Sequence, residues 1–167
     1  MSKAENKVQW CLNQAKNQLA EGRKHRGLVI VKPDNLLARE YVEKAEHNLE
    51  FFLLARKNGF YDWAINIGFY VTYHCCLAII TKFGYESRNQ DCTLAAVESL
   101  IEEGKIDKDF QRYVESISPD TGEETVIPMR EKYQYTPIIA IDKQKVEELL
   151  GLCQDMIKDT KGIVQEL

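Results

Sequence analysis

The chain has 167 residues, of which 44% are hydrophobic and 29% are charged, and its net charge is −4. This balance is typical of one globular domain and excludes an intrinsically disordered chain. The acidic balance, with a pI near 5.5, also excludes a protein that coats nucleic acid non-specifically, because such binding needs a surplus of lysine and arginine.

Two segments bear on the compartment of the chain. The segment Met1 to Lys7 is polar and leads into no apolar signal sequence, which favours a cytoplasmic protein. The run from Trp63 to Ile80 is apolar enough to resemble a membrane span, but it carries Asn66, Thr72 and His74. Polar groups at mid-bilayer depth are costly. We therefore expect a fully buried central helix and no membrane contact.

The five cysteines are odd in number, and two of them are adjacent within an apolar run. No CxxC or Cys/His ligand spacing occurs, so neither a metal nor any other cofactor is expected. We predict that all five are buried free thiols in a reducing compartment. They are Cys11, Cys75, Cys76, Cys92 and Cys153.

The first predicted helix spans residues 3–20, where apolar residues recur every three or four positions, and Gly22 ends it. Its inward stripe is Val8, Cys11, Leu12, Ala15 and Leu19. The basic run Arg23 to Arg26 follows, either as a solvated linker or as a small nucleic-acid footprint. Pro33 cannot continue a helix, and Asp34 is a suitable N-cap for the next one.

The second predicted helix spans residues 35–58, and the Asn58-Gly59 pair is a C-cap signal. Its inward stripe is Leu37, Tyr41, Ala45, Leu49, Phe52 and Ala55. The third helix, residues 60–83, is apolar on nearly all sides and should lie at the centre of the fold.

After a polar loop over residues 85–90, Asp91 should cap a fourth helix that ends near residue 103, and a short fifth helix spans residues 107–117. Helical periodicity then fails between residues 118 and 141, where proline and glycine recur. We expect one helical turn there, over residues 129–133. The last helix runs from the N-cap Asp142 to about residue 165, and no strand is predicted.

The second and third helices carry a resemblance to a known family. Residues 38–49 contain a Lys-Ala-Glu segment that precedes a leucine, and Gly59, Tyr61 and Ala64 open the third helix. That helix continues with Phe69-Tyr70 and Tyr73-His74, and it exits through Phe83-Gly84-Tyr85-Glu86. In combination these elements resemble the HEPN family over about residues 38–101, with weaker support from residue 129 onward.

The resemblance implies an all-α, up-and-down helical bundle of about five to six helices. It also implies one domain over residues 1–167, with a core at 34–167 and the helix 3–20 packed on it. The chain is most similar to small stand-alone prokaryotic HEPN proteins of the nucleotidyltransferase-associated type.

Active HEPN proteins share a metal-independent ribonuclease motif, in which an arginine precedes a histidine and two copies meet in a homodimer. The histidine serves as general acid or base when the 2′-hydroxyl attacks its own phosphate, and the arginine stabilises the phosphorane. In this chain Arg130 matches the arginine, but Tyr135 stands in place of the histidine. A phenol, with an ordinary pKa near 10, is a poor base at neutral pH, so we expect a degenerate motif.

Arg130 is therefore either an exposed loop arginine or a retained phosphate contact. His74 is the alternative base, and it shares one helix face with Tyr70. A hydrogen-bonded core histidine is the competing interpretation of His74. The candidate catalytic residues are thus Arg130, Tyr135 and His74.

The candidate binding residues are Tyr70, Tyr73, Asp62, Arg88 and Asn89. Asp62 could equally cap the third helix or face solvent, and the Ser87-Arg88-Asn89 loop is either an anion-binding loop or an ordinary turn. His25 and His47 are expected to be solvated.

Three functions follow from these patterns. The first is a homodimeric HEPN protein of RNA or nucleotide biology that partners a nucleotidyltransferase chain in a toxin–antitoxin-like pair, with a degenerate nuclease motif. The second is a non-catalytic module that binds a nucleotide or a protein segment. The third is a metal-independent ribonuclease that uses Arg130 with Tyr135 or His74.

Overall fold

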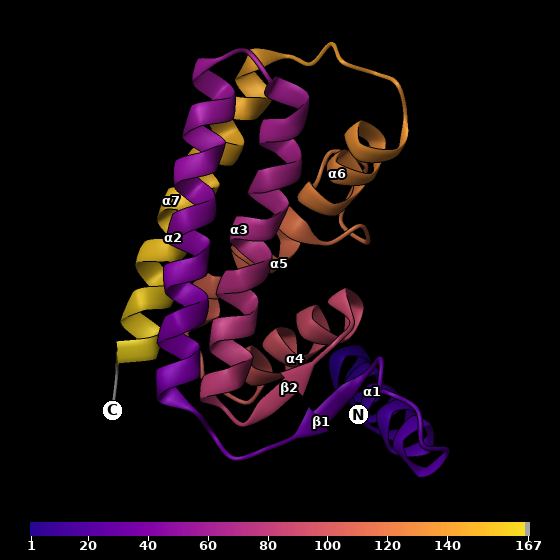
Figure 1. Ribbon diagram of the computed structural model, residues 1–167. Helices are drawn as coiled ribbons and strands as arrows, with labels where there is room; N and C mark the ends of the chain where they lie inside the picture. The colour runs from indigo at the N-terminus through magenta and orange to yellow at the C-terminus, as the bar shows by residue number, and fades with distance from the viewer. Residues whose placement is uncertain (166–167) are drawn as a thin grey trace.

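The computed structural model describes residues 1–165, and these form helices with one small sheet (Figure 1). The predicted all-α class is confirmed, with seven α-helices among the described residues. In chain order the elements are α1 (Lys3–Ala20), β1 (Leu28–Ile30), α2 (Asn35–Lys57), α3 (Tyr61–Lys82), β2 (Tyr85–Ser87), α4 (Gln90–Glu102), the 3₁₀ helix η1 (Lys108–Phe110), α5 (Gln111–Ile117), α6 (Val126–Tyr135) and α7 (Lys143–Gln165).

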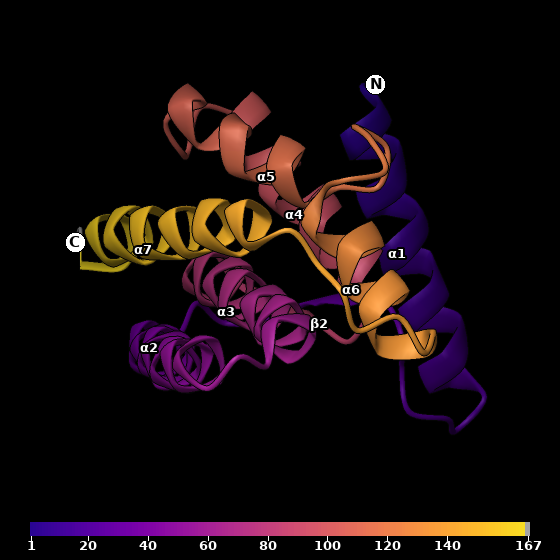
Figure 2. The same cartoon turned by 90° about the horizontal axis from the view of Figure 1, so that it is seen from above.

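Three long helices form the body of the molecule. Helices α2 and α3 pack against each other, and α7 packs against both (Figure 1). Helix α6 packs on α3, and Figure 2 shows it on the side of α3 away from α2. Helices α1 and α4 pack together at one end, where the two strands also lie.

Side-chain caps fix the N-terminal ends of α1 and α2. The Ser2 hydroxyl accepts from the Glu5 amide at 3.0 Å while the Glu5 carboxylate accepts from the Ser2 amide, which makes a capping box for α1. The Asp34 carboxylate caps α2 by accepting from the Leu37 amide at 2.9 Å, as predicted. Helix α3 has no side-chain cap, so burial rather than capping stabilises it.

Helix α3 is the centre of the fold. By length and composition it is the one helix of the described residues that could cross a membrane, and 83% of its most apolar window is buried within the protein. Close packing explains Gly68, because a Cβ there would lie 2.5 Å from Leu149 Cδ2 of α7. The position thus admits only glycine without a shift of α7 or of the Leu149 side chain.

The expectation that the chain would contain no strand was wrong. Leu28–Ile30 pairs antiparallel with Tyr85–Ser87, with Leu28 opposite Ser87. Each strand has only three residues, too few for alternation to be visible in the sequence. His25 was also wrongly expected to be solvated, since it is 4% exposed and its Nε2 lies 2.8 Å from Glu86 Oε1 of β2.

The prediction of five free thiols was wrong for one pair. Cys11 of α1 and Cys92 of α4 form a disulfide across 81 residues of sequence. Spacing could not reveal it, because only the packing of α1 on α4 brings the two residues together. Cys75, Cys76 and Cys153 are buried free thiols, as expected.

Several boundaries and faces also differ from expectation. Asn89, not Asp91, caps α4 by accepting from the Cys92 amide at 3.1 Å. Leu19 and Leu37, which were placed inward, are 51% and 39% exposed. Residues 118–141 contain a full helix, α6, instead of one turn.

Candidate functional site

Arg130 lies in the middle of α6, not in a loop. Pro128 looked like a helix breaker, but it is the third residue of α6, where a backbone N–H has no intrahelical acceptor to lose. The interpretation of Arg130 as an exposed arginine is therefore wrong. The residue is 8% exposed.

The guanidinium of Arg130 sits between three elements. Its Nη1 donates to Gln134 Oε1 one turn later at 2.9 Å, and its Nη2 donates to Gln90 Oε1 of α4 at 3.3 Å. Its Cζ lies 4.3 Å from the centroid of the Phe69 ring on α3, a cation–π contact. The buried Nε has no hydrogen-bond partner among the described residues.

These contacts leave the charge of Arg130 without a carboxylate partner in the described part of the chain. Buried cations are normally paired, because removing a charge from water is expensive. Two amide oxygens and an aromatic face offset part of that cost. An anion would complete the arrangement, and phosphate suits a planar guanidinium.

Asn66 of α3 is a second buried polar group with no partner. It is 3% exposed, and neither its Oδ1 nor its Nδ2 has a hydrogen-bond partner among residues 1–165. Its position is three residues before Phe69 and seven before Tyr73, so all three share one stripe of the helix. Asn66 thus lies on the side of α3 whose Phe69 ring receives Arg130.

Tyr73 extends the same stripe toward the start of α4. Its ring stacks on Phe69 at 5.5 Å, and its hydroxyl lies 3.5 Å from Thr93 Oγ1. Burial raises the pKa of Tyr73, so this hydroxyl stays protonated at neutral pH. Thr93 donates to Ser87 Oγ at 2.7 Å, which joins Tyr73 to the segment before α4.

The other two candidate catalytic residues lie apart from Arg130. Tyr135 follows Arg130 by five residues, a rotation of about 140° around the helix, and it is 71% exposed. His74 faces α2, where its ring lies 6.1 Å from that of Tyr41. Its Nδ1 donates to the Tyr70 carbonyl at 2.7 Å, and the Asn48 amide lies 3.3 Å away. Among the described residues, Arg130 contacts Gln134, Gln90 and Phe69, and neither Tyr135 nor His74 is one of its partners.

The remaining candidates are dispersed. Tyr70 is 41% exposed and contacts Phe69 edge to face, so it borders the arginine cluster from the solvent side. Asp62 is half-buried in the first turn of α3 and does not cap it. Arg88 is exposed, with Nε 3.4 Å from Glu86 Oε1. Asn89 has the structural role of capping α4.

Sequence reasoning missed Gln90, Gln134, Phe69 and Asn66 as parts of the cluster. Gln134 had a usable signal, since it lies four residues after Arg130 and so faces it on a helix. Gln90 had none, because its contact with Arg130 spans 40 positions of sequence.

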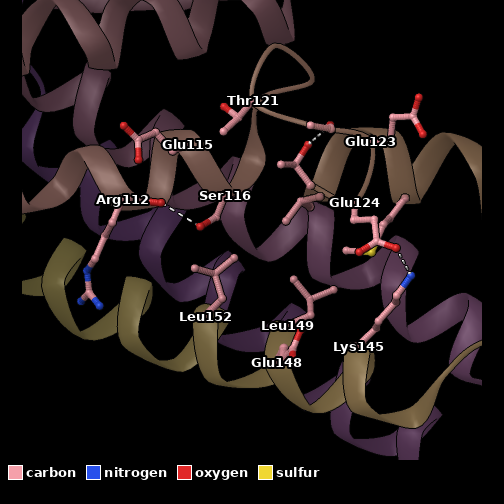
Figure 3. A pocket seen from close by; sticks show the side chains of 14 residues that line it. Arg112, Glu115, Ser116, Thr121, Glu123, Glu124, Lys145, Glu148, Leu149 and Leu152 are labelled. Atoms are coloured by element: carbon pink, nitrogen blue, oxygen red, sulfur yellow. Dashed lines mark hydrogen bonds and ion pairs between the residues drawn. The ribbon is translucent and has the colours of Figure 1, made fainter.

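A cavity of about 670 Å³ lies between α5, the loop before α6, and α7, and it contains none of the predicted site residues (Figure 3). Its floor includes Leu149 and Leu152, and its rim is mainly carboxylate. Both cations of the lining are already paired, Lys145 with Glu124 at 2.7 Å and Arg112 with Asp159 at 3.2 Å. This cavity would repel a phosphate, so the Arg130 cluster is the better candidate for an anionic ligand.

The fold and the cluster define an all-α helical bundle with a buried arginine between α3, α4 and α6. The family model of the HEPN domain matches residues 38–163. The chain belongs to the HEPN family. This membership associates it with RNA and nucleotide biology in general. No curated protein and no solved structure matches the chain.

Proposed function

We propose that this HEPN protein binds a phosphate group of RNA or of a nucleotide through Arg130 and does not cleave RNA. The observation that carries the proposal is the buried guanidinium, whose hydrogen-bond acceptors are neutral and whose Nε is unpartnered. A phosphate would supply the missing negative charge through a charge-assisted hydrogen bond.

Cleavage of RNA by the family motif needs a histidine beside the arginine as general acid or base, and residues 1–165 place none there. The expected position of the histidine holds Tyr135, which points away from Arg130 on α6. The other candidate base, His74, is bonded to the Tyr70 carbonyl and packs toward α2. Loss of such a group typically reduces the rate by two to four powers of ten.

The wider proposal is a homodimer that partners a nucleotidyltransferase chain in a toxin–antitoxin-like pair. Family resemblance supports this part. Its test is co-purification with a nucleotidyltransferase encoded by a neighbouring gene. Absence of such a complex would remove the pairing but not the phosphate contact.

The main test compares the purified protein with Arg130→Ala and Arg130→Lys on a long unstructured RNA, with chelator present. We expect no cleavage by any of the three proteins. Binding should weaken about 10- to 100-fold in Arg130→Ala, the range that one or two hydrogen bonds to a charged group supply. Arg130→Lys should lie between, because lysine keeps the charge and loses the planar fork.

Arg39→Ala is the matched control, since Arg39 is exposed on α2 and its loss removes the same charge. Circular dichroism establishes that each variant is folded. Strong cleavage by the wild type that is lost in Arg130→Ala would show that the motif is an active nuclease. Equal binding by Arg130→Ala and Arg39→Ala would refute the phosphate contact.

A further inference from the structure

One edge of the buried Arg130 guanidinium is nearly without hydrogen-bond partners among the described residues. Nε and Nη2 form that edge, and together they make the fork that receives two oxygens of an anion. Nε has no partner among the described residues, and Nη2 has only the 3.3 Å bond to Gln90 Oε1. This distance is beyond the usual range of an N–H···O hydrogen bond. The opposite side is satisfied, because Nη1 is held by Gln134 at 2.9 Å.

The same edge faces the start of a helix. Gln90 is the first residue of α4, which has 13 residues. The first backbone amides of a helix lack intrahelical acceptors. Asn89 takes the amide of Cys92, and the Thr93 amide donates to the Asn89 carbonyl, so those of Gln90 and Asp91 are the two left by the cap. Such amides and the helix dipole favour an anion.

Two carboxylates lie near this place and oppose an anion. Asp91 is in the first turn of α4, and Glu131 follows Arg130 on α6. Both side chains are exposed, so water and salt screen them, whereas Arg130 is buried. The electrostatic potential at the guanidinium edge therefore stays positive.

We propose that Gln90 occupies the position of a phosphate oxygen and is displaced when a phosphate binds between the Arg130 Nε–Nη2 edge and the first turn of α4. This inference rests on the proposed function and deepens it, because it names the residues that surround the phosphate. The ligand class is a phosphate group, either in an RNA phosphodiester or as a free phosphate. After displacement the backbone N–H of Gln90 can donate to the ligand.

The test uses Gln90→Glu and Gln90→Ala with two probes, a labelled single-stranded RNA oligonucleotide and inorganic phosphate. Glutamate at position 90 would pair with Arg130 from within the protein. We expect this variant to lose at least about tenfold in affinity for the probe that binds, and to melt at a higher temperature in phosphate-free buffer. Gln90→Ala should bind that probe as tightly as the wild type or more tightly, because no side chain must be displaced.

Gln154→Glu is the control, since it makes the same charge change on an exposed part of α7. Phosphate binding that Gln90→Glu abolishes, without any RNA binding, would support the inference and refute the RNA part of the proposed function. RNA binding that is equal in Gln90→Glu and Gln154→Glu would overturn the inference and leave the function standing. Loss of binding in Gln90→Ala would overturn the inference that Gln90 occupies the position of a phosphate oxygen. A wild type that binds neither probe would overturn both proposals.

Discussion

His74 is held at the contact of α2 and α3 by a 2.7 Å bond from Nδ1 to the Tyr70 carbonyl. Burial lowers its pKa, and the nearby positive charge of Lys44 lowers it further, although the bond to Tyr70 acts in the opposite direction. The folded protein therefore takes up a proton at this site less readily than the unfolded chain does. The stability due to His74 is present above the ordinary histidine pKa and is lost as the pH falls below it.

We predict that the wild type loses more stability between pH 7.5 and pH 5 than His74→Asn does, because asparagine can donate to Tyr70 and does not titrate. Urea unfolding at the two pH values gives the comparison. His47→Asn is the control, since His47 is exposed on α2. Identical pH dependence in the wild type and His74→Asn would show that His74 titrates equally in both states.

At the scale of single residues, the sequence identified candidate residues better than it predicted what surrounds them in the fold. Arg130 was identified by its place in a motif, but its burial depends on α6 packing against α3, which no local pattern specifies. His25 was missed for the same reason, because its partner Glu86 lies on a strand 61 positions away. A local signal gave the cap of α2, where Asp34 and its partner Leu37 lie three residues apart.

Among the elements, α1 is attached to the family domain by a covalent bond. It packs on α4, and the Cys11–Cys92 disulfide closes a ring that contains α2 and α3. A chain-entropy estimate for a separation of 81 residues gives about 4.5 kcal/mol of stabilisation. Reduction acts by exchange, in which an external dithiol is oxidised while Cys11 and Cys92 become thiols.

We predict that reduction lowers the free energy of unfolding by several kcal/mol, up to about that estimate. Thiol titration provides the measurement of the bond itself. The denatured protein should present three thiols without reductant and five after reduction. The native protein should react slowly, because burial raises the pKa of Cys75 to about 12 and also raises those of Cys76 and Cys153.

A Cys11→Ser, Cys92→Ser variant should resemble the reduced protein, and it should respond to reductant no further. Five reactive thiols in the denatured, unreduced protein would contradict the cross-link. Unchanged unfolding of the wild type after verified reduction would show that packing alone holds α1.

Element prediction succeeded where periodicity and caps agree. Helix α1 was predicted with the boundaries it has, and α2, α3 and α7 were predicted to within one or two residues. It failed at α6, where Pro128 falls in the first turn, and at β1 and β2, which pair across more than 50 positions of sequence. These failures share one cause, which is that the deciding contact is tertiary.

For the whole molecule, the homodimer expected from the family resemblance remains a prediction, and the surface that would form it can now be named. The apolar faces of α3 and α7 are covered within one chain. Uncovered apolar side chains gather instead at the α2–α3 turn, where they line a cavity of about 350 Å³. The large ones are Phe51, Leu54, Phe60 and Trp63, each more than half exposed. Such a patch marks an interaction surface.

We predict that light scattering gives a dimer mass at micromolar concentration and that Leu54→Glu with Trp63→Ser gives a monomer. A charge and a lost ring at the patch should break a symmetric contact between copies. Trp10→Ser is the control, because Trp10 is about as exposed as Trp63 but lies on α1. A monomeric wild type would refute the dimer, and a dimeric double variant would place the contact elsewhere.

The antiparallel pairing of β1 with β2 has a consequence for where this polypeptide can be divided. The family match begins at residue 38, after α1 and β1. A protein cut there would keep Cys92 without its partner, expose the side of α4 that α1 covers, and leave β2 as a single unpaired strand. The cut would therefore produce an aggregation-prone fragment in which the Cys92 thiol is open to oxidation. The start of the family match, residue 38, is therefore not a position at which a stable fragment of this chain can begin.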